Sequence, residues 1–130
     1  MKDKTDKIEL LLPLKAEYVS LARLTASGVA NRVGFDIETI EDIKVAISEV
    51  CSKLVSVGSN SAENYSIKFI IQGINLRIEF NCEDQSLGCI FKEDEEGLGV
   101  SIINALMDDV EFCSSGSYLF SMSIALKGDN

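Results

Sequence analysis

Glu49 and Lys53 are the first residues of this sequence whose types and spacing could do chemistry. They stand four apart in the stretch AISEVCSKLV, residues 46–55. In an α-helix this spacing brings the two side chains together on one face. A carboxylate and an ammonium placed so are either a surface ion pair, worth about 0.2–0.5 kcal/mol, or two members of an active site.

Two further stretches have residues suited to binding. DQSLG, residues 84–88, directly follows a predicted strand, although any Asp-x-Ser-x-Gly can also make a plain turn. GLG, residues 97–99, opens a predicted helix, where free backbone N–H groups and the helix dipole favour phosphate. KEDEE, residues 92–96, puts four carboxylates immediately before it, and these would repel a phosphate unless turned away.

Composition narrows the classes of function. The chain has 130 residues, which predicts one domain over residues 1–130. Its net charge is -9, from 21 acidic and 12 basic residues, a poor match for nucleic acid or an anionic membrane. The sequence has no histidine, which excludes Ser-His-Asp and Cys-His chemistry.

The cysteines indicate no metal site, because their spacing matches no zinc pattern. Charged residues follow Met1 where a signal peptide would be apolar, and no apolar run reaches the roughly 20 residues of a membrane span. We therefore expect a cytoplasmic protein with reduced thiols that act as small buried hydrophobic residues. The four are Cys51, Cys82, Cys89 and Cys113.

The first half of the chain predicts one strand and two helices. Residues 7–14 form the strand, and Pro13 places it at an edge or end of a sheet. A helix over 15–33 ends at Gly34, and Asp36 caps the next helix, over 37–57. The apolar residues of that helix recur at helical spacing and form one core-facing stripe, made of Ile40, Ile43, Ile47, Val50 and Leu54.

After a loop at 58–64, the spacing of the apolar residues changes from that of a helix to that of a strand. Residues 65–73 and 74–82 alternate as a hairpin around Gly73, with apolar positions at Ile74, Leu76, Ile78, Phe80 and Cys82. A helix over 98–110 and a second hairpin, 110–115 with 117–126, complete the pattern. This order predicts an α+β, two-layer sandwich: a mostly antiparallel sheet with helices on one face. Its site would lie between the helix layer and the loops around 83–99.

Over nearly its whole length the chain resembles the RsbW-type anti-sigma factors. These are serine-protein kinases of the GHKL, or histidine-kinase-like, ATPase superfamily. The order of elements carries the resemblance, as do LARLTASGVANRVGF, IEDIKVAISEVCSKLV and EEGLGVSIINALMDDVEF. The resemblance implies a Bergerat-type fold, an ATP site, a homodimer, and two protein partners, a sigma factor and an anti-anti-sigma protein.

The family's motif on the second helix is Glu-x-x-x-Asn, and it assigns Glu49 as general base on the attacking hydroxyl. Its asparagine, whose amide oxygen holds Mg²⁺, is Lys53 here, and an ammonium offers no oxygen ligand. Three explanations remain open: a dead nucleotide site, a Lys53 that contacts phosphate in place of the metal, or an ion pair with Glu49.

The family's other two motifs are kept in part. In Asp-x-Gly-x-Gly, Asp84 and Gly88 match, and Asp84 would accept from the adenine amino group, whereas Ser86 replaces a glycine and would crowd the base. The third motif matches at the start of the helix, with Gly97, Leu98 and Gly99 as the phosphate-binding residues. Only residues 89–96 connect the two motifs, which is short for a lid over the phosphates.

Arg23, on the first helix, matches the arginine that contacts the sigma factor and the anti-anti-sigma partner in the family. It could equally be an exposed solubilising charge. The sequence as a whole favours a partner-switching regulator of anti-sigma type with a degenerate ATP site. The alternatives are an active ATP-dependent serine-protein kinase, and a small-molecule sensor that shares only the order of elements.

Overall fold

The computed structural model describes residues 4–84, 98–112 and 118–127. Its elements, in chain order, are β1 (Thr5–Pro13), a 3-10 turn (Ala16–Tyr18), α1 (Val19–Val33), α2 (Ile37–Gly58), β2 (Asn64–Gln72), β3 (Asn75–Cys82), α4 (Leu98–Leu106), β4 (Asp109–Phe112) and β5 (Phe120–Ala125).

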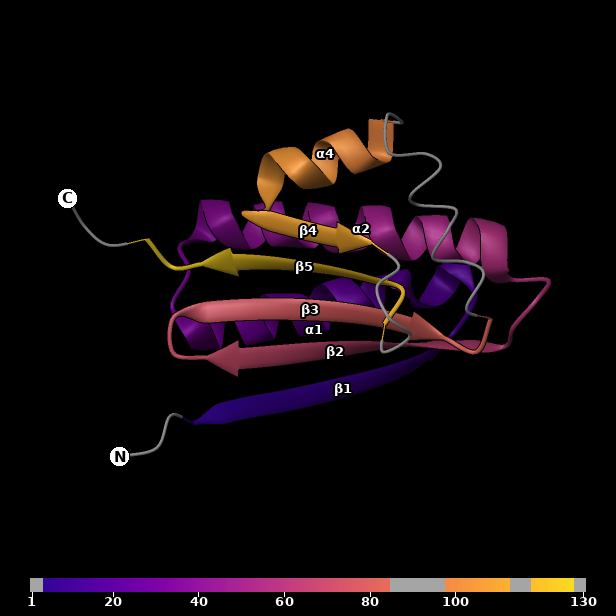
Figure 1. Ribbon diagram of the computed structural model, residues 1–130, viewed down its shortest axis with the longest axis horizontal. Helices are drawn as coiled ribbons and strands as arrows, with labels where there is room; N and C mark the ends of the chain where they lie inside the picture. The colour runs from indigo at the N-terminus through magenta and orange to yellow at the C-terminus, as the bar shows by residue number, and fades with distance from the viewer. Residues whose placement is uncertain (1–3, 85–97, 113–117, 128–130) are drawn as a thin grey trace.

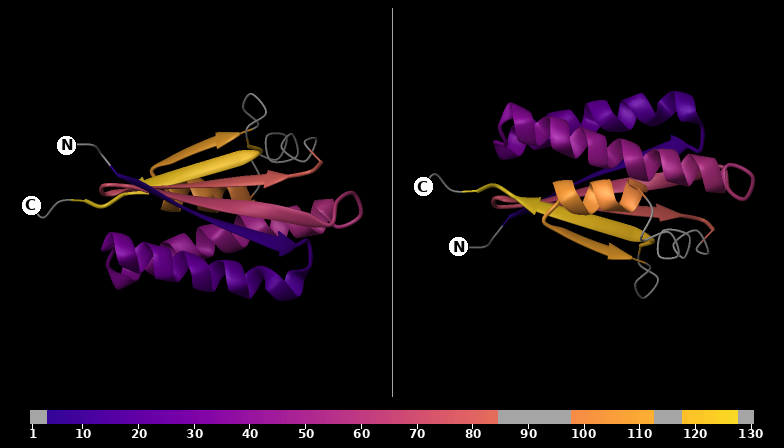
Figure 2. Two further views of the ribbon diagram at one scale, coloured as in Figure 1. Left: turned by 90° about the horizontal axis from the view of Figure 1, so that it is seen from below. Right: turned by 90° about the horizontal axis from the view of Figure 1, so that it is seen from above.

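The strands form one five-stranded sheet in the order β1-β2-β3-β5-β4, and every pairing is antiparallel. Within the described residues, the helices α1, α2 and α4 lie on one face of this sheet and form a second layer (Figure 2). The predicted α+β sandwich is confirmed. β1 lies at an edge of the sheet and Pro13 is its last residue, as the proline indicated.

The turn between α1 and α2 follows the predicted capping chemistry. Gly34 takes a left-handed conformation with φ 111°, which glycine adopts without strain. The Asp36 side chain then accepts a hydrogen bond from the backbone N–H of Thr39 at 2.8 Å. Hydrogen bonding with the side chain of Thr39, and then with its backbone N–H, holds the pKa of the Asp36 carboxyl below its ordinary value. The two helices are therefore set antiparallel by three residues of local sequence.

The structure corrects three predicted boundaries. α1 begins at Val19 instead of residue 15, because Lys15 is extended and residues 16–18 form the 3-10 turn. α4 ends at Leu106 instead of 110, because Asp109–Phe112 pairs with β5 as a strand. Ile74 is a turn residue, 54% exposed, because Gln72 pairs with Asn75 and leaves Gly73 and Ile74 as the hairpin loop.

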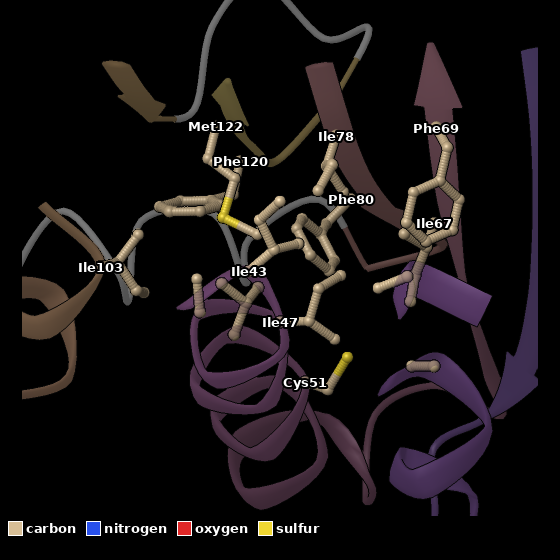
Figure 3. Close-up of a cluster of buried hydrophobic side chains, with 14 of the residues drawn as sticks. Ile43, Ile47, Cys51, Ile67, Phe69, Ile78, Phe80, Ile103, Phe120 and Met122 are labelled. Atoms are coloured by element: carbon tan, nitrogen blue, oxygen red, sulfur yellow. The ribbon is translucent and has the colours of Figure 1, made fainter. Parts of the chain in front are cut away.

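The core lies between the sheet and the helix layer. The stripe on α2 faces the sheet: Ile43, Ile47, Val50 and Leu54 are fully buried, and Ile40 packs against them half-buried. Side chains from β3 and β5 meet this stripe (Figure 3), and the rings of Phe80 and Phe120 pack 6.0 Å apart between centroids. This packing fixes the position of α2 over the central strands.

Among the residues that the structure describes, one buried side-chain oxygen has no hydrogen bond. The Tyr65 hydroxyl, at the start of β2, lies within the core without a partner of hydrogen-bonding geometry. Burial raises the pKa of this hydroxyl, and the adjacent Cys51 thiol of α2 raises it further. An unsatisfied buried hydroxyl costs about 1–3 kcal/mol.

Tyr65→Phe is therefore expected to stabilise the protein by about 1 kcal/mol, because it removes the unpaired oxygen and keeps the ring. Urea unfolding of the wild type and the variant measures the change. Tyr118→Phe is the matched control, since the Tyr118 hydroxyl donates to Glu111 at 2.8 Å and its loss should not stabilise. Equal stability of wild type and Tyr65→Phe would mean that the hydroxyl has a partner in solution.

Candidate nucleotide site

Three elements that carry predicted site residues meet at one end of the molecule. The C-terminal half of α2, the end of β3 and the start of α4 all lie toward the right of Figure 1. α2 also packs directly against α4. The fold therefore brings together the elements that hold Glu49, Lys53, Asp84 and the GLG motif, although these motifs are up to 50 residues apart in the sequence.

Glu49 and Lys53 are both half-buried on α2, on the flank of the helix next to its core-facing stripe. Val50 and Cys51, between them in sequence, are fully buried against the sheet. The ion pairs that the structure gives for its described residues do not include one between Glu49 and Lys53. Lys53 nevertheless makes an interaction of its own. The simple ion-pair interpretation of this motif therefore gains no support.

Asp84 lies two residues beyond the end of β3 and is half-buried. The backbone of Leu98 and Gly99 forms the first turn of α4, at the same end of the molecule. Ser86, Gly88 and Gly97 lie outside the described residues. Of the predicted nucleotide-binding residues, Lys53, Asp84 and the start of α4 are thus at one end of the fold, together with Glu49.

One of the described thiols, that of Cys51, lies close to Glu49 in the sequence and is unreactive. Cys51 follows Glu49 by two residues but points into the core (Figure 3). Burial raises its pKa to about 12, so the sulfur stays protonated and unreactive at neutral pH. Cys82 is buried too, and its thiol contacts the backbone oxygen of Asn64 at 3.5 Å. The prediction of small buried thiols is confirmed for these two, while Cys89 and Cys113 lie outside the described residues.

A cluster on the opposite face of the sheet was not predicted. Arg77 on β3 donates to Glu79 at 2.9 Å and to Glu111 on β4 at 3.1 Å. The Tyr118 ring lies 5.2 Å from the guanidinium, and hydrogen bonds from Tyr118 and Arg77 hold the pKa of the Glu111 carboxyl below its ordinary value. Alternation of β3 places Arg77 and Glu79 on one face, but only the strand order reveals Glu111 as their partner.

A cavity of about 490 Å³ lies at the other end of α2. Its lining includes Asp36, Thr39 and Asp42 from the first turns of that helix, and Met107 and Asp108 after α4. Thr39 and Lys53 are 14 residues apart on α2, or about 21 Å at 1.5 Å per residue. This cavity is therefore separate from the end of the molecule that carries Glu49, Lys53 and Asp84.

Lys53 supplies no ligand for a magnesium ion on α2. Mg²⁺ requires oxygen ligands, and the ammonium of Lys53 has only N–H donors. No group of three or more Asp, Glu or Cys side chains in residues 4–84, 98–112 and 118–127 could hold a metal. Within the same described ranges, no helix is long and apolar enough to span a membrane.

Comparison with known proteins gives the family. Residues 12–119 match the model of the histidine kinase-like ATPase domain. "Serine-protein kinase RsbW" of Bacillus thuringiensis (strain Al Hakam) is 37% identical over 128 residues, covering 85% of this chain and 79% of the relative. The protein of the same name from Bacillus cereus (strain B4264) is 36% identical over 129 residues, with the same coverage. The chain therefore belongs to the histidine kinase-like ATPase family and, within it, to the RsbW-type anti-sigma factors and serine-protein kinases.

Proposed function

We propose that this chain is a partner-switching regulator that sequesters a sigma factor and is released by an antagonist protein of the anti-anti-sigma kind. The observation that carries the proposal is similarity to RsbW over 85% of the chain, combined with Lys53 at the position where the family places a metal-binding asparagine. Binding of proteins needs the fold and its surfaces, whereas phosphoryl transfer needs an intact site. The chain keeps the fold, whereas Lys53 changes the site that phosphoryl transfer needs.

The α1 surface supports the partner-binding part of the proposal. Arg23 is exposed there, and its neighbour Leu24 is 70% exposed. Leu21, one turn earlier, is also exposed. Arginine is enriched at protein interfaces, and the two exposed leucines beside it add apolar surface that a partner could cover. We assign Arg23 as a partner-binding residue on this basis.

Arg23→Glu is expected to weaken sigma-factor binding by about tenfold or more, because the variant places a carboxylate where the guanidinium fork would bind. The measurement is surface-immobilised binding of the chain to a panel of purified sigma factors from its source organism. Arg32→Glu is the matched control: it reverses an exposed arginine on the last turn of the same helix. The melting temperature of Arg23→Glu should equal that of the wild type, whereas that of Arg32→Glu should be slightly lower, because a carboxylate at the C-terminus of a helix opposes the helix dipole.

Two results would contradict this proposal separately. Wild-type protein that binds no sigma factor in the panel would remove the anti-sigma function. Wild-type protein that binds one, with Arg23→Glu binding equally well, would keep the function and remove Arg23 from the interface.

Nucleotide binding is the second part of the proposal. We assign Lys53, Asp84, Ser86, Gly88, Gly97, Leu98 and Gly99 to the nucleotide and no residue to a metal. Asp84 would accept from the base, the N–H groups at the start of α4 would donate to phosphate oxygens, and Lys53 would supply positive charge. Ser86 brings a side chain where the family has none, so the base would be held less closely.

An active serine-protein kinase is the second candidate function, and the name of the relatives favours it. Bound ATP would supply the phosphoryl group. Glu49 would then accept the proton of a serine hydroxyl on the antagonist protein, which is the role of a general base. Its half-buried position beside Lys53 on α2 suits a carboxylate that must meet a partner's side chain. Phosphate incorporation into the antagonist by wild type, and its loss in Glu49→Gln, would select this candidate.

A further inference from the structure

The cavity at the first turns of α2 belongs to neither part of the proposed function. It lies toward the left of Figure 1, where α2 begins and where α4 and β5 end. Its described lining residues include none that is assigned above to the nucleotide or to a protein partner. Its volume of about 490 Å³ is within the range of about 300–1,000 Å³ that small-molecule sites occupy. The fold therefore provides a second place that is large enough for a small organic ligand.

The deep part of this cavity is apolar. Phe35, from the turn between α1 and α2, lines it together with Met107, after α4, and Ile124, on β5. All three are buried residues of the core. An aromatic ring is a favourable neighbour for both the ring of Phe35 and the thioether of Met107. The lining therefore suits a ligand with an apolar, aromatic body.

Hydrogen bonds fix the walls of the cavity. The Asp108 carboxylate accepts from the backbone N–H of Ala125 at 2.8 Å, and the backbone N–H of Asp108 donates to the carbonyl of Ser123 at 2.9 Å. These two bonds join the segment after α4 to β5. On the α2 side, the bond from the Thr39 N–H to Asp36 holds the start of the helix. The cavity thus has its shape before a ligand enters, which lowers the cost of binding.

The rim of the cavity sets the charge of the ligand. Asp36, Asp42 and Asp108 contribute three carboxylates, and Lys127 contributes one ammonium. Asp36 and Asp108 accept hydrogen bonds from the backbone, and Lys127 lies 3.7 Å from Asp108. Within the described part of the chain, Asp42 makes no hydrogen bond or ion pair. Its carboxylate is therefore free to bind a cation at the edge of the apolar lining.

An organic cation fits this rim better than a metal ion or an anion does. No group of three or more Asp, Glu or Cys side chains in residues 4–84, 98–112 and 118–127 could hold a metal. The start of α2 would favour an anion, but the Asp36 carboxylate already caps it and would repel a second negative charge. A single ammonium group needs only one free carboxylate, and Asp42 supplies it.

We propose that the cavity between the starts of α2 and the ends of α4 and β5 binds a small aromatic amine. The ring of the ligand packs against Phe35 and Met107, and its ammonium group lies at Asp42. The cavity and its apolar lining carry this proposal, and the rim decides only the sign of the charge. The site is independent of the proposed function, because it shares no residue with the nucleotide site or with Arg23.

Titration of the whole chain with phenethylamine, followed by ¹H–¹⁵N correlation spectra, tests the proposal. We expect a dissociation constant of about 1 mM or lower for this probe. The amide signals that move should include those of Thr39, Ala105 and Ala125, which line the cavity, and not that of Lys53. The uncharged analogue 2-phenylethanol should bind about tenfold more weakly, because it lacks the ammonium group. The anion 3-phenylpropionate should not bind.

Two pairs of variants test the residues. Asp42→Asn should weaken phenethylamine binding by about tenfold, whereas Glu38→Gln, which removes an exposed carboxylate one turn earlier on α2, should not. Ala105→Trp should abolish binding, because the new side chain fills the cavity. Asn104→Trp is its control, since Asn104 is exposed on α4 and does not line the cavity. Melting temperatures establish that each variant is folded.

Several results would overturn the proposal. One is the absence of any shift at about 10 mM phenethylamine, which is tenfold above the expected dissociation constant. Another is equal binding of phenethylamine and 2-phenylethanol, or equal binding by wild type and Asp42→Asn, because the rim would then not recognise the charge. Unchanged binding by Ala105→Trp would place the probe elsewhere on the molecule. Each measurement is made without ATP and without a sigma factor, so failure here leaves the proposed function untouched.

Discussion

Lys53→Asn is expected to make ATP binding by this protein depend on Mg²⁺, with an affinity gain of about tenfold or more when the metal is added. The asparagine amide supplies an oxygen at a place where the wild type supplies an ammonium. Wild-type protein, by contrast, should bind ATP weakly and with no improvement from Mg²⁺. Calorimetric titration of both proteins with ATP, with and without the metal, measures the four affinities.

Two matched variants separate the possible roles of Lys53. Lys53→Met keeps the length of the side chain and removes its charge, so it should lose metal-free ATP binding if the ammonium contacts phosphate. Lys44→Asn makes the same amide substitution earlier on α2, where Lys44 pairs with Glu41 at 3.0 Å. It should leave ATP binding as in wild type, which controls for the loss of a lysine from this helix.

The outcomes discriminate between the explanations that the sequence leaves open. Mg²⁺-dependent binding by Lys53→Asn would mean that the pocket is intact and that one side chain removes the metal. Weak binding by wild type that Lys53→Met abolishes would identify Lys53 as a substitute cation. No heat from any of the proteins at millimolar ATP, with unchanged melting temperatures, would leave an interaction domain that has no nucleotide.

Local sequence was enough to predict most of the fold. Asp36 and Gly34 act through bonds within four residues, so their capping roles follow from the sequence alone. The stripe on α2 is equally local, because a helical period needs no knowledge of what it packs against. Pro13 correctly indicated an edge strand, since a proline cannot donate to a neighbouring strand.

The errors arose where tertiary pairing overrides local preference. Residues 109 and 110 continue the helical spacing of α4, yet their pairing with β5 draws them into a strand. Ile74 fits the alternation of β3, but the hairpin loop needs two residues, and Ile74 is one of them. Arg77 contacts Glu111 because β3, β5 and β4 are neighbours in the sheet, and no short stretch of sequence specifies this strand order.

The candidate site could be predicted as a set of elements and less well as a set of contacts. Helical spacing put Glu49 and Lys53 on one face of α2, and the family resemblance put Asp84 and the start of α4 near them. The structure brings these elements to one end of the molecule. Side-chain partners depend on which rotamers the neighbouring elements leave open, and spacing alone does not specify these.

Phe80→Ala should have the largest effect on stability, a loss of about 3–5 kcal/mol in the free energy of unfolding. Phe80 is fully buried on β3, with strands on both sides of it. Its ring faces α2 and packs against that of Phe120 (Figure 3). Truncation of the side chain to a methyl group removes the favourable free energy of burying the ring. It also leaves a cavity that the flanking strands cannot close. Domains of this size have a total free energy of unfolding of about 5–15 kcal/mol, so the variant would be only marginally stable.

Urea unfolding followed by circular dichroism measures this loss, with Ile74→Ala as the control. Ile74 is apolar too, but it lies in the hairpin loop and is 54% exposed, so its truncation should change stability by less than about 0.5 kcal/mol. The comparison tests the side-chain alternation of β3, because the sequence alone placed both residues on the same buried face. Similar losses in the two variants would contradict the hairpin register. A loss near zero for Phe80→Ala would mean that β3 does not hold α2, and with it Glu49 and Lys53, in place.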